Sequence, residues 1–110
     1  MTGPDTIADI ALALPAVEQH THFGLPAYRV ADKPFAVLQP SGHAVLHADR
    51  DNAERLAADT PDACELVLRG ERFIGIRVDL SRIGDDELRR LVTAAWRNKA
   101  PKRLATAHGY

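Results

Sequence analysis

Residues 17–48 read VEQHTHFGLPAYRVADKPFAVLQPSGHAVLHA, and this stretch decides the class of fold. Its apolar residues come in short, partly alternating runs separated by glycine, proline and aspartate, as is typical of strands joined by tight turns. The predicted strands are Val17–His22, Ala27–Val30, Phe35–Gln39 and Ala44–His47. The predicted turns between them are Gly24-Leu25-Pro26, Ala31-Asp32-Lys33 and Pro40-Ser41-Gly42. Connections this short favour antiparallel hairpins.

Two more strands are expected further along the chain, at Cys64–Arg69 and Phe73–Leu80, joined at Gly70-Glu71. In the second of them apolar and polar residues alternate. One face carries Ile74, Ile76, Val78 and Leu80, and the other carries Gly75, Arg77 and Asp79. That pattern predicts a sheet with one buried face and one face in water.

Helical patterns flank the first four strands. The first helix is expected to begin near Thr2, which can cap it ahead of Pro4, and to stop at Pro15. Its apolar stripe consists of Ile7, Ile10, Ala11 and Leu14. For the second helix Asp51 is the predicted cap, with Glu54 three residues later.

The last helix has the clearest signal in the sequence. Asp85, Asp86 and Glu87 place negative charge in its first turn, where the helix dipole favours it. A continuous apolar stripe follows, made of Leu88, Leu91, Val92, Ala95 and Trp96. Pro101 ends this helix, and residues 102–107 are expected to add a short helical tail.

The predicted element order is therefore α-ββββ-α-ββ-α. Because strands follow one another in runs instead of alternating with helices, the fold class is α+β. We expect two layers, in which the first and third helices cover one face of an antiparallel sheet. A chain of 110 residues with 45% apolar and 26% charged residues fits one globular domain spanning residues 1–110.

Composition excludes several classes of protein. Cys64 is the only cysteine, so neither an intrachain disulfide nor a cysteine-based zinc cluster can form, and we expect a buried structural thiol. Residues 1–9 lack the basic and apolar segments of an export signal, and every apolar run is far shorter than the ~20 residues of a membrane helix. The sequence predicts a cytoplasmic protein that does not enter a membrane.

The sequence contains no recognisable pattern of catalytic residues. Ser41 and Ser81 lie outside any Gly-x-Ser-x-Gly motif, and the glycines are too scattered for a phosphate loop or a dinucleotide fingerprint. We expect a non-enzymatic protein without a cofactor.

Charge is unevenly distributed, although the net charge is only −1. From Arg89 onward there are six basic and no acidic side chains, whereas residues 1–88 carry eight basic and fifteen acidic ones. Such asymmetry is typical of an anion-binding face. The alternative is that these cations complement the dipole at the C-terminal end of the last helix. With only six aromatic residues in the chain, stacking on single-stranded nucleic acid is disfavoured.

His20 and His22 form a second candidate site. They alternate on the first predicted strand, so both imidazoles point to one face, and two imidazoles at this spacing can chelate a transition metal. The candidates for a third ligand are His43, His47 and Asp49. Because the pattern supplies only a pair, we interpret the two histidines as exposed or hydrogen-bonded side chains and expect no metal site.

Several segments together resemble a known family. His22–Val30 (HFGLPAYRV) is followed by Lys33 and Phe35-Ala36, and near the end Trp96 precedes Ala100–Ala105 (APKRLA). These segments resemble the MmcQ/YjbR family of small bacterial proteins over nearly the whole chain. The resemblance implies a frataxin-like (CyaY-like) fold. It also implies double-stranded DNA as the partner, because the paired hairpins of the family are compared with the double wing of DNA-binding proteins.

The first hypothesis is therefore a non-enzymatic DNA-binding module. Its phosphate contacts are predicted to be Arg89, Arg97, Lys99, Lys102 and Arg103, with Lys33 at a wing tip. Two departures from the family pattern lower the positive charge near the wings. Residues 69–73 (RGERF) stand where relatives often carry tryptophan or histidine, and His47 stands where a lysine is common.

Two other functions stay open. An adaptor that binds a protein or a small ligand on the open sheet face would show an exposed apolar patch or pocket beside Phe23 and Tyr28. A metal-handling protein would follow from the frataxin-like fold together with His20 and His22. The first helix offers only Asp5 and Asp9 for the acidic ridge that such a fold uses for iron.

Overall fold

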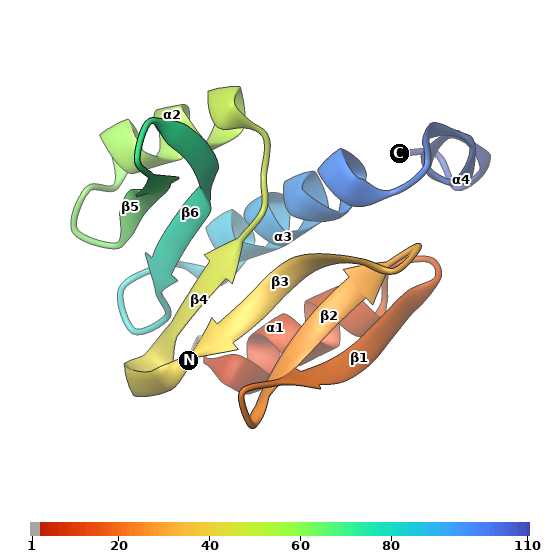
Figure 1. The fold of residues 1–110 in the computed structure, drawn as a ribbon, viewed down its shortest axis with the longest axis horizontal. Coiled ribbons are helices and arrows are strands. Elements are labelled where there is room, and N and C mark those ends of the chain that lie inside the picture. Colours follow the sequence, from red (N-terminus) through yellow and green to blue (C-terminus); the bar gives the residue numbers. More distant parts are fainter. Residues whose placement is uncertain (1–2) are drawn as a thin grey trace.

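The chain forms a six-stranded antiparallel sheet with helices packed on it (Figure 1). This computed structural model describes residues 3–110. The helices are α1 (Pro4–Leu12), α2 (Arg50–Asp59), α3 (Asp85–Lys99) and α4 (Lys102–Ala107). The strands are β1 (Val17–His22), β2 (Leu25–Val30), β3 (Lys33–Gln39), β4 (His43–Leu46), β5 (Cys64–Arg69) and β6 (Arg72–Asp79), with a short 3₁₀ turn, η1 (Pro40–Gly42), before β4. The strands lie in the order β1-β2-β3-β4-β6-β5, and the predicted α+β class is confirmed.

The structure confirms the six predicted strands. Some of their boundaries differ from the predicted ones. β1 and β5 have the predicted limits, whereas β2 begins at Leu25, because Leu25 and Pro26 pair with His22 and Thr21 of β1. The predicted turn at residues 24–26 is therefore wrong. The turn is Phe23-Gly24, with φ angles of 50° and 80°. Two positive φ angles are typical of the type I′ turn, whose twist matches that of the strands it joins.

The helices form a layer on one face of the sheet (Figure 1). α1 and α3 pack against each other and cover strands β1 to β4, as predicted for the first and third helices. α2 covers β5 and β6 and lies beside α3. The opposite face carries exposed side chains such as Glu18, His22 and Arg77. Every helix within residues 3–110 is too short or too polar to cross a membrane.

The core is apolar and lies between α3 and the sheet. The whole predicted stripe of α3 is buried, and the largest fully buried side chains are Trp96, Tyr28 and Phe35. Trp96, which belongs to the predicted apolar stripe, is a core residue, and Tyr28 and Phe35 belong to the same core cluster. Cys64 is also buried, as predicted, and burial raises the pKa of its thiol.

Gly75 lets β6 approach β4 closely in the middle of the sheet. A Cβ atom at this position would lie 2.6 Å from the carbonyl oxygen of Leu46. The predicted alternation along β6 holds for buried Ile76 and Val78 and for exposed Arg77. Gly75, expected on the wet face, is buried because the backbone of Leu46 and His47 covers it.

The start of α2 differs from the sequence prediction. Its cap is Asp49, whose Oδ2 accepts a 3.2 Å hydrogen bond from the backbone N–H of Asn52 and whose Oδ1 accepts a 2.6 Å hydrogen bond from the Asn52 side chain. Asp51, the predicted cap, lies in the first turn instead. At α1 the cap is Gly3, and the predicted cap Thr2 lies outside the described residues.

Candidate functional site

Four of the six predicted phosphate contacts lie where α3 meets α4. Arg97 and Lys99 belong to the last turn of α3, and Lys102 and Arg103 open α4 after the interruption at Pro101. All are exposed except Lys99, which is half-buried. We call these four residues the basic end. In Figure 1 α4 extends past the sheet at one end of the molecule.

The basic end carries its charge without carboxylate partners. Five ion pairs join described residues: Arg29–Glu18, His43–Asp79, Arg50–Glu54, Arg77–Glu65 and Arg82–Asp79. Within residues 3–110, the basic end, Arg89 and Lys33 take part in none of these pairs. No ion pair between described residues therefore neutralises the basic end.

A favourable interaction with the helix dipole explains only two of the four cations of the basic end. Arg97 and Lys99 lie at the C-terminal end of α3, where the helix dipole favours cations. Lys102 and Arg103 lie in the first turn of α4, where it disfavours them, and that turn contains no acidic residue. Helix stability therefore does not explain the cations of α4.

Polar contacts hold the end of α3 against the segment that follows β4. The side chain of Asn98 donates a 2.7 Å hydrogen bond to the carbonyl oxygen of His47, and Nδ1 of His47 lies 3.2 Å from the carbonyl oxygen of Ile74. Burial is the main influence on the pKa of His47, which is lowered; the charge of Lys99 acts in the same direction and the Ile74 carbonyl opposes it. His47 is therefore neutral at neutral pH and adds no positive charge beside Lys99.

The other two predicted contacts occupy separate positions. Lys33 is exposed directly after the Ala31-Asp32 turn, at the hairpin tip where it was predicted. This turn lies toward the same end of the longest axis as α4 (Figure 1). Arg89 lines a groove between α1 and α3 together with Asp9, whereas Arg97 lines one beside α2. The structure thus places Arg89 and Arg97 on opposite flanks of α3.

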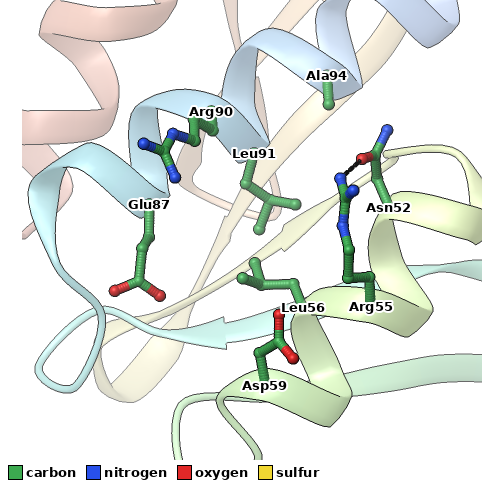
Figure 2. Close-up of a pocket in the computed structure, with 8 residues that line it drawn as sticks. All are labelled: Asn52, Arg55, Leu56, Asp59, Glu87, Arg90, Leu91 and Ala94. Carbon is green, nitrogen blue, oxygen red and sulfur yellow. Dashed lines mark hydrogen bonds between the residues drawn. The ribbon is translucent and has the colours of Figure 1, made fainter.

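A groove of about 280 Å³ lies between α2 and α3 (Figure 2). Its lining comprises Asn52, Arg55, Leu56 and Asp59 from α2 and Glu87, Arg90, Leu91 and Ala94 from α3. The late residue Asp59 of α2 and the early residue Glu87 of α3 line the same groove, so the two helices run in opposite directions along it. Nη2 of Arg55 donates a hydrogen bond to Oδ1 of Asn52.

This groove continues toward the basic end. A second hollow of about 280 Å³ shares Asn52 and Ala94 with the first and is also lined by Asp49, Arg97 and Asn98. Sequence reasoning did not select Arg55 as a functional residue, because α2 alone shows no cluster of basic side chains. The sequence shows that α2 and α3 each have a polar face, but it does not show that these two faces lie beside each other.

His20 and His22 remain a pair without a third ligand. Both lie on β1, at the edge of the sheet, whereas His43 belongs to β4, three strands away. Three strand spacings of about 4.8 Å put β4 roughly 14 Å from β1. Within residues 3–110, no group of three or more histidine, cysteine, aspartate or glutamate side chains is arranged to hold a metal ion.

Phe23 and Tyr28 do not form the common surface that the adaptor hypothesis requires. Phe23 is 93% exposed at the β1–β2 turn and packs edge-on against His22. Tyr28 is 2% exposed and belongs to the core. These two side chains therefore do not share one exposed surface.

The fold and the basic end define a small α+β protein in which one helical layer backs an open sheet and ends in a cluster of cations that form no ion pair among residues 3–110. The family model described as YjbR matches residues 12–98. The chain therefore belongs to the YjbR family, and the resemblance found in the sequence is confirmed.

A solved structure supports the fold independently. The chain is similar to the crystal structure of Deinococcus radiodurans protein DR2400, which carries the family-model domain DUF419. The TM-score is 0.76, covering 99% of this chain and 89% of that one, at 16% sequence identity. This likeness shows a shared fold, while the frataxin-like and double-wing descriptions stay predictions. No curated protein matches the sequence.

Proposed function

We propose that this protein is a non-enzymatic, cytoplasmic module that binds double-stranded DNA through its basic end. The observation that carries the proposal is that Arg97, Lys99, Lys102 and Arg103 form no ion pair within the described chain. Two of them also oppose the dipole of α4. Phosphate oxygens would supply the missing acceptors, because Lys and Arg side chains form charge-assisted contacts with them.

Lys33 would extend the contact along the duplex. It is the first residue of β3, and the β2–β3 turn before it lies toward the same end of the longest axis as α4 (Figure 1). The longest dimension of the molecule is 35 Å, about the length of one turn of B-DNA. A single duplex turn would therefore be long enough to meet both the basic end and the hairpin tip.

The aromatic side chains favour duplex over single-stranded DNA. Binding of single strands uses exposed rings on which bases stack. Tyr110, which follows α4, packs its ring edge-on against Trp96 with a centroid distance of 5.0 Å. Tyr110 is 42% exposed, but a single ring gives no platform on which successive bases can stack, so recognition of phosphates on a duplex is the better match.

Fluorescence anisotropy with a labelled duplex of about two turns tests the proposal. The four cations of the basic end and Lys33 would make five phosphate contacts and give a slope of log K against log salt of about −4.5, so affinity should fall roughly 500-fold between about 50 mM and about 200 mM salt. A single strand of the same length should bind more weakly. Absence of duplex binding at about 50 mM salt, where phosphate contacts are strong, contradicts the proposal.

A further inference from the structure

We propose that β1 pairs edge to edge with β1 of a second copy of this chain, and that histidines of both copies bind a zinc ion at the junction. One chain alone supplies only His20 and His22, so the site is incomplete without the second copy, which we call the partner. This inference rests on the edge of the sheet. It depends neither on DNA binding nor on the frataxin-like description.

β1 lies at one edge of the sheet and lacks the usual protection against a further strand (Figure 1). Proteins normally block such an edge with lysine, proline, a β-bulge or a covering segment. The sequence of β1, VEQHTH, contains neither lysine nor proline, and its register with β2 is unbroken from Val17 to His22. In the described chain, no backbone hydrogen bond joins residues 17–22 to any segment other than β2. The outer side of β1 can therefore accept another strand.

The backbone groups of Gln19 and Thr21 point away from β2. His22 and Leu25 flank the two-residue turn, which is the hydrogen-bonded position of such a hairpin. Bonded and non-bonded positions alternate along an antiparallel pair, so Thr21 and Gln19 face outward. Pro26, which has no N–H, lies opposite Thr21, as a non-bonded position allows. A strand from the partner can use these outward N–H and C=O groups.

Two-fold symmetry and the pleat of the strand limit the register of this pairing. Residues directly opposite each other in an antiparallel pair lie on the same face of the sheet, so the symmetry axis must pass through a residue and not between two. With the axis at His20, the outward-facing Gln19 meets the partner's Thr21 as a hydrogen-bonded pair. His20 itself meets the partner's His20 as a non-bonded pair.

This register also brings complementary side chains together. Glu18 meets the partner's His22, and its exposed contact with Arg29, with Oε1 3.8 Å from Nε, leaves Oε2 for the imidazole. Phe23, which is 93% exposed at the turn, comes beside the partner's Val17. Pairing in this register thus gives an exposed aromatic ring an apolar neighbour.

The pairing gathers the imidazoles of both copies on the open face of the joined sheet. His20 and the partner's His20 would have Cβ atoms about 4.5–5.5 Å apart, the spacing of directly opposite residues. His22 lies on the same face, about 6.6 Å further along each strand. Zinc binds nitrogen and oxygen ligands in a tetrahedron, with Zn–N distances of about 2.0–2.1 Å. Two histidines from each strand can supply these ligands, whereas one strand supplies only a pair.

His20 lacks a polar partner in the single chain. Its Nδ1 atom is buried and has no hydrogen-bond partner among the described residues. Buried polar atoms in proteins are almost always satisfied, and an exception calls for an ion, a water molecule or another group. A neutral imidazole keeps a lone pair on one nitrogen, which can bind a metal ion. The proposed junction gives this ring the partner that it lacks.

Sedimentation velocity of the full chain, in zinc chloride and in EDTA, tests the proposal. We expect a monomer of 12.0 kDa in EDTA and twice that mass in zinc, with one ion bound per pair of chains. His20→Ala and His22→Ala should each abolish the doubling of mass. His108→Ala removes an exposed imidazole elsewhere and should leave the doubling unchanged. A monomer in both solutions, a dimer that EDTA does not dissociate, or equal behaviour of all three variants overturns the proposal.

A proline substitution separates strand pairing from simple cross-linking by histidines. Gln19→Pro removes an N–H that faces outward, a position at which edge strands tolerate proline. It should keep the circular dichroism spectrum of the unmodified chain and lose the zinc-dependent dimer. A dimer that survives in a folded Gln19→Pro variant overturns the proposed pairing. Neutralising Lys102 and Arg103 should weaken DNA binding and leave the response to zinc unchanged, so the two proposals fail independently.

Discussion

The indole Nε1 of Trp96 donates a 3.0 Å hydrogen bond to the carbonyl oxygen of Pro15, across a sequence separation of 81 residues. Pro15 lies between α1 and β1, and Trp96 lies one residue before the basic end begins. The bond therefore fastens the end of α3 to the start of the sheet. Because Trp96 is fully buried, water cannot replace the Pro15 carbonyl as the acceptor of the indole N–H.

Removing this hydrogen bond should destabilise the protein. Trp96→Phe leaves the Pro15 carbonyl without its donor and creates a small cavity, so the free energy of unfolding should fall by about 1–3 kcal/mol. Urea denaturation followed by far-UV circular dichroism measures the change. Tyr110→Phe, which keeps the ring that packs on Trp96, is the control and should match the unmodified protein. A Trp96→Phe midpoint equal to that of the control would rule out a stabilising role for this bond.

The two candidate caps of α2 can be told apart by substitution. Asp49→Ala removes both hydrogen bonds to Asn52 and should cost about 1 kcal/mol of unfolding free energy. Asp51→Ala removes only a first-turn charge and should cost less, about 0.3–1 kcal/mol. Thermal and urea unfolding of the two variants compare them directly. A larger loss for Asp51→Ala would contradict the observed cap.

The contribution of the Asp49 carboxyl should depend on pH. Burial raises its pKa, but hydrogen bonds from Asn52 and the charge of Arg55 outweigh burial, and the pKa lies below its ordinary value. The stability difference between the unmodified protein and Asp49→Ala should therefore be constant above about pH 5 and shrink as the pH falls below about 4, through the lower pKa of the folded state. The same unfolding experiments, repeated in acidic buffers, measure this stability difference.

His47 should make the fold less stable in mild acid. Burial lowers its pKa in the folded state, so the unfolded chain binds a proton more readily. The stabilising effect is complete above the unfolded pKa of about 6.5 and is lost as the pH decreases below it. The change in unfolding free energy between about pH 7.5 and pH 5.5 should be smaller in His47→Gln than in the unmodified chain. His108→Gln removes an exposed imidazole as the control, and an identical pH response in both variants would contradict the prediction.

Neutralising the cations of α4 should change the salt dependence of DNA binding. The double variant Lys102→Gln/Arg103→Gln should reduce the slope of log K against log salt by about 1.8, since each phosphate contact contributes about 0.9. The control is Arg50→Gln/Arg77→Gln, which removes the same charge from residues already paired with Glu54 and Glu65. Unlike the first variant, it should keep the slope. Equal slopes for both double variants would show that only net charge matters.

Local patterns predicted most of the fold. Alternation in β6 and the stripe of α3 are repeats within a few residues, and the backbone period alone places such side chains on one face. Boundaries were less predictable because they depend on a partner strand. Leu25 and Pro26 belong to β2 only because β1 pairs with them. Asp49 and Asp51 both fit the pattern of a cap, and the path of the chain after β4 selects Asp49.

By itself, the sequence determined the strand and helix pattern, the buried Trp96 and the basic end, because each of these is local or contiguous in the chain. Only the tertiary structure decided that Arg89 and Arg97 line different grooves and that Glu87 and Asp59 share one. The physical reason is that α2 and α3 meet only after the sheet has brought them side by side. The packing of the two helices decides which charges face each other across a groove. The spacing of residues along one helix does not predict its neighbour.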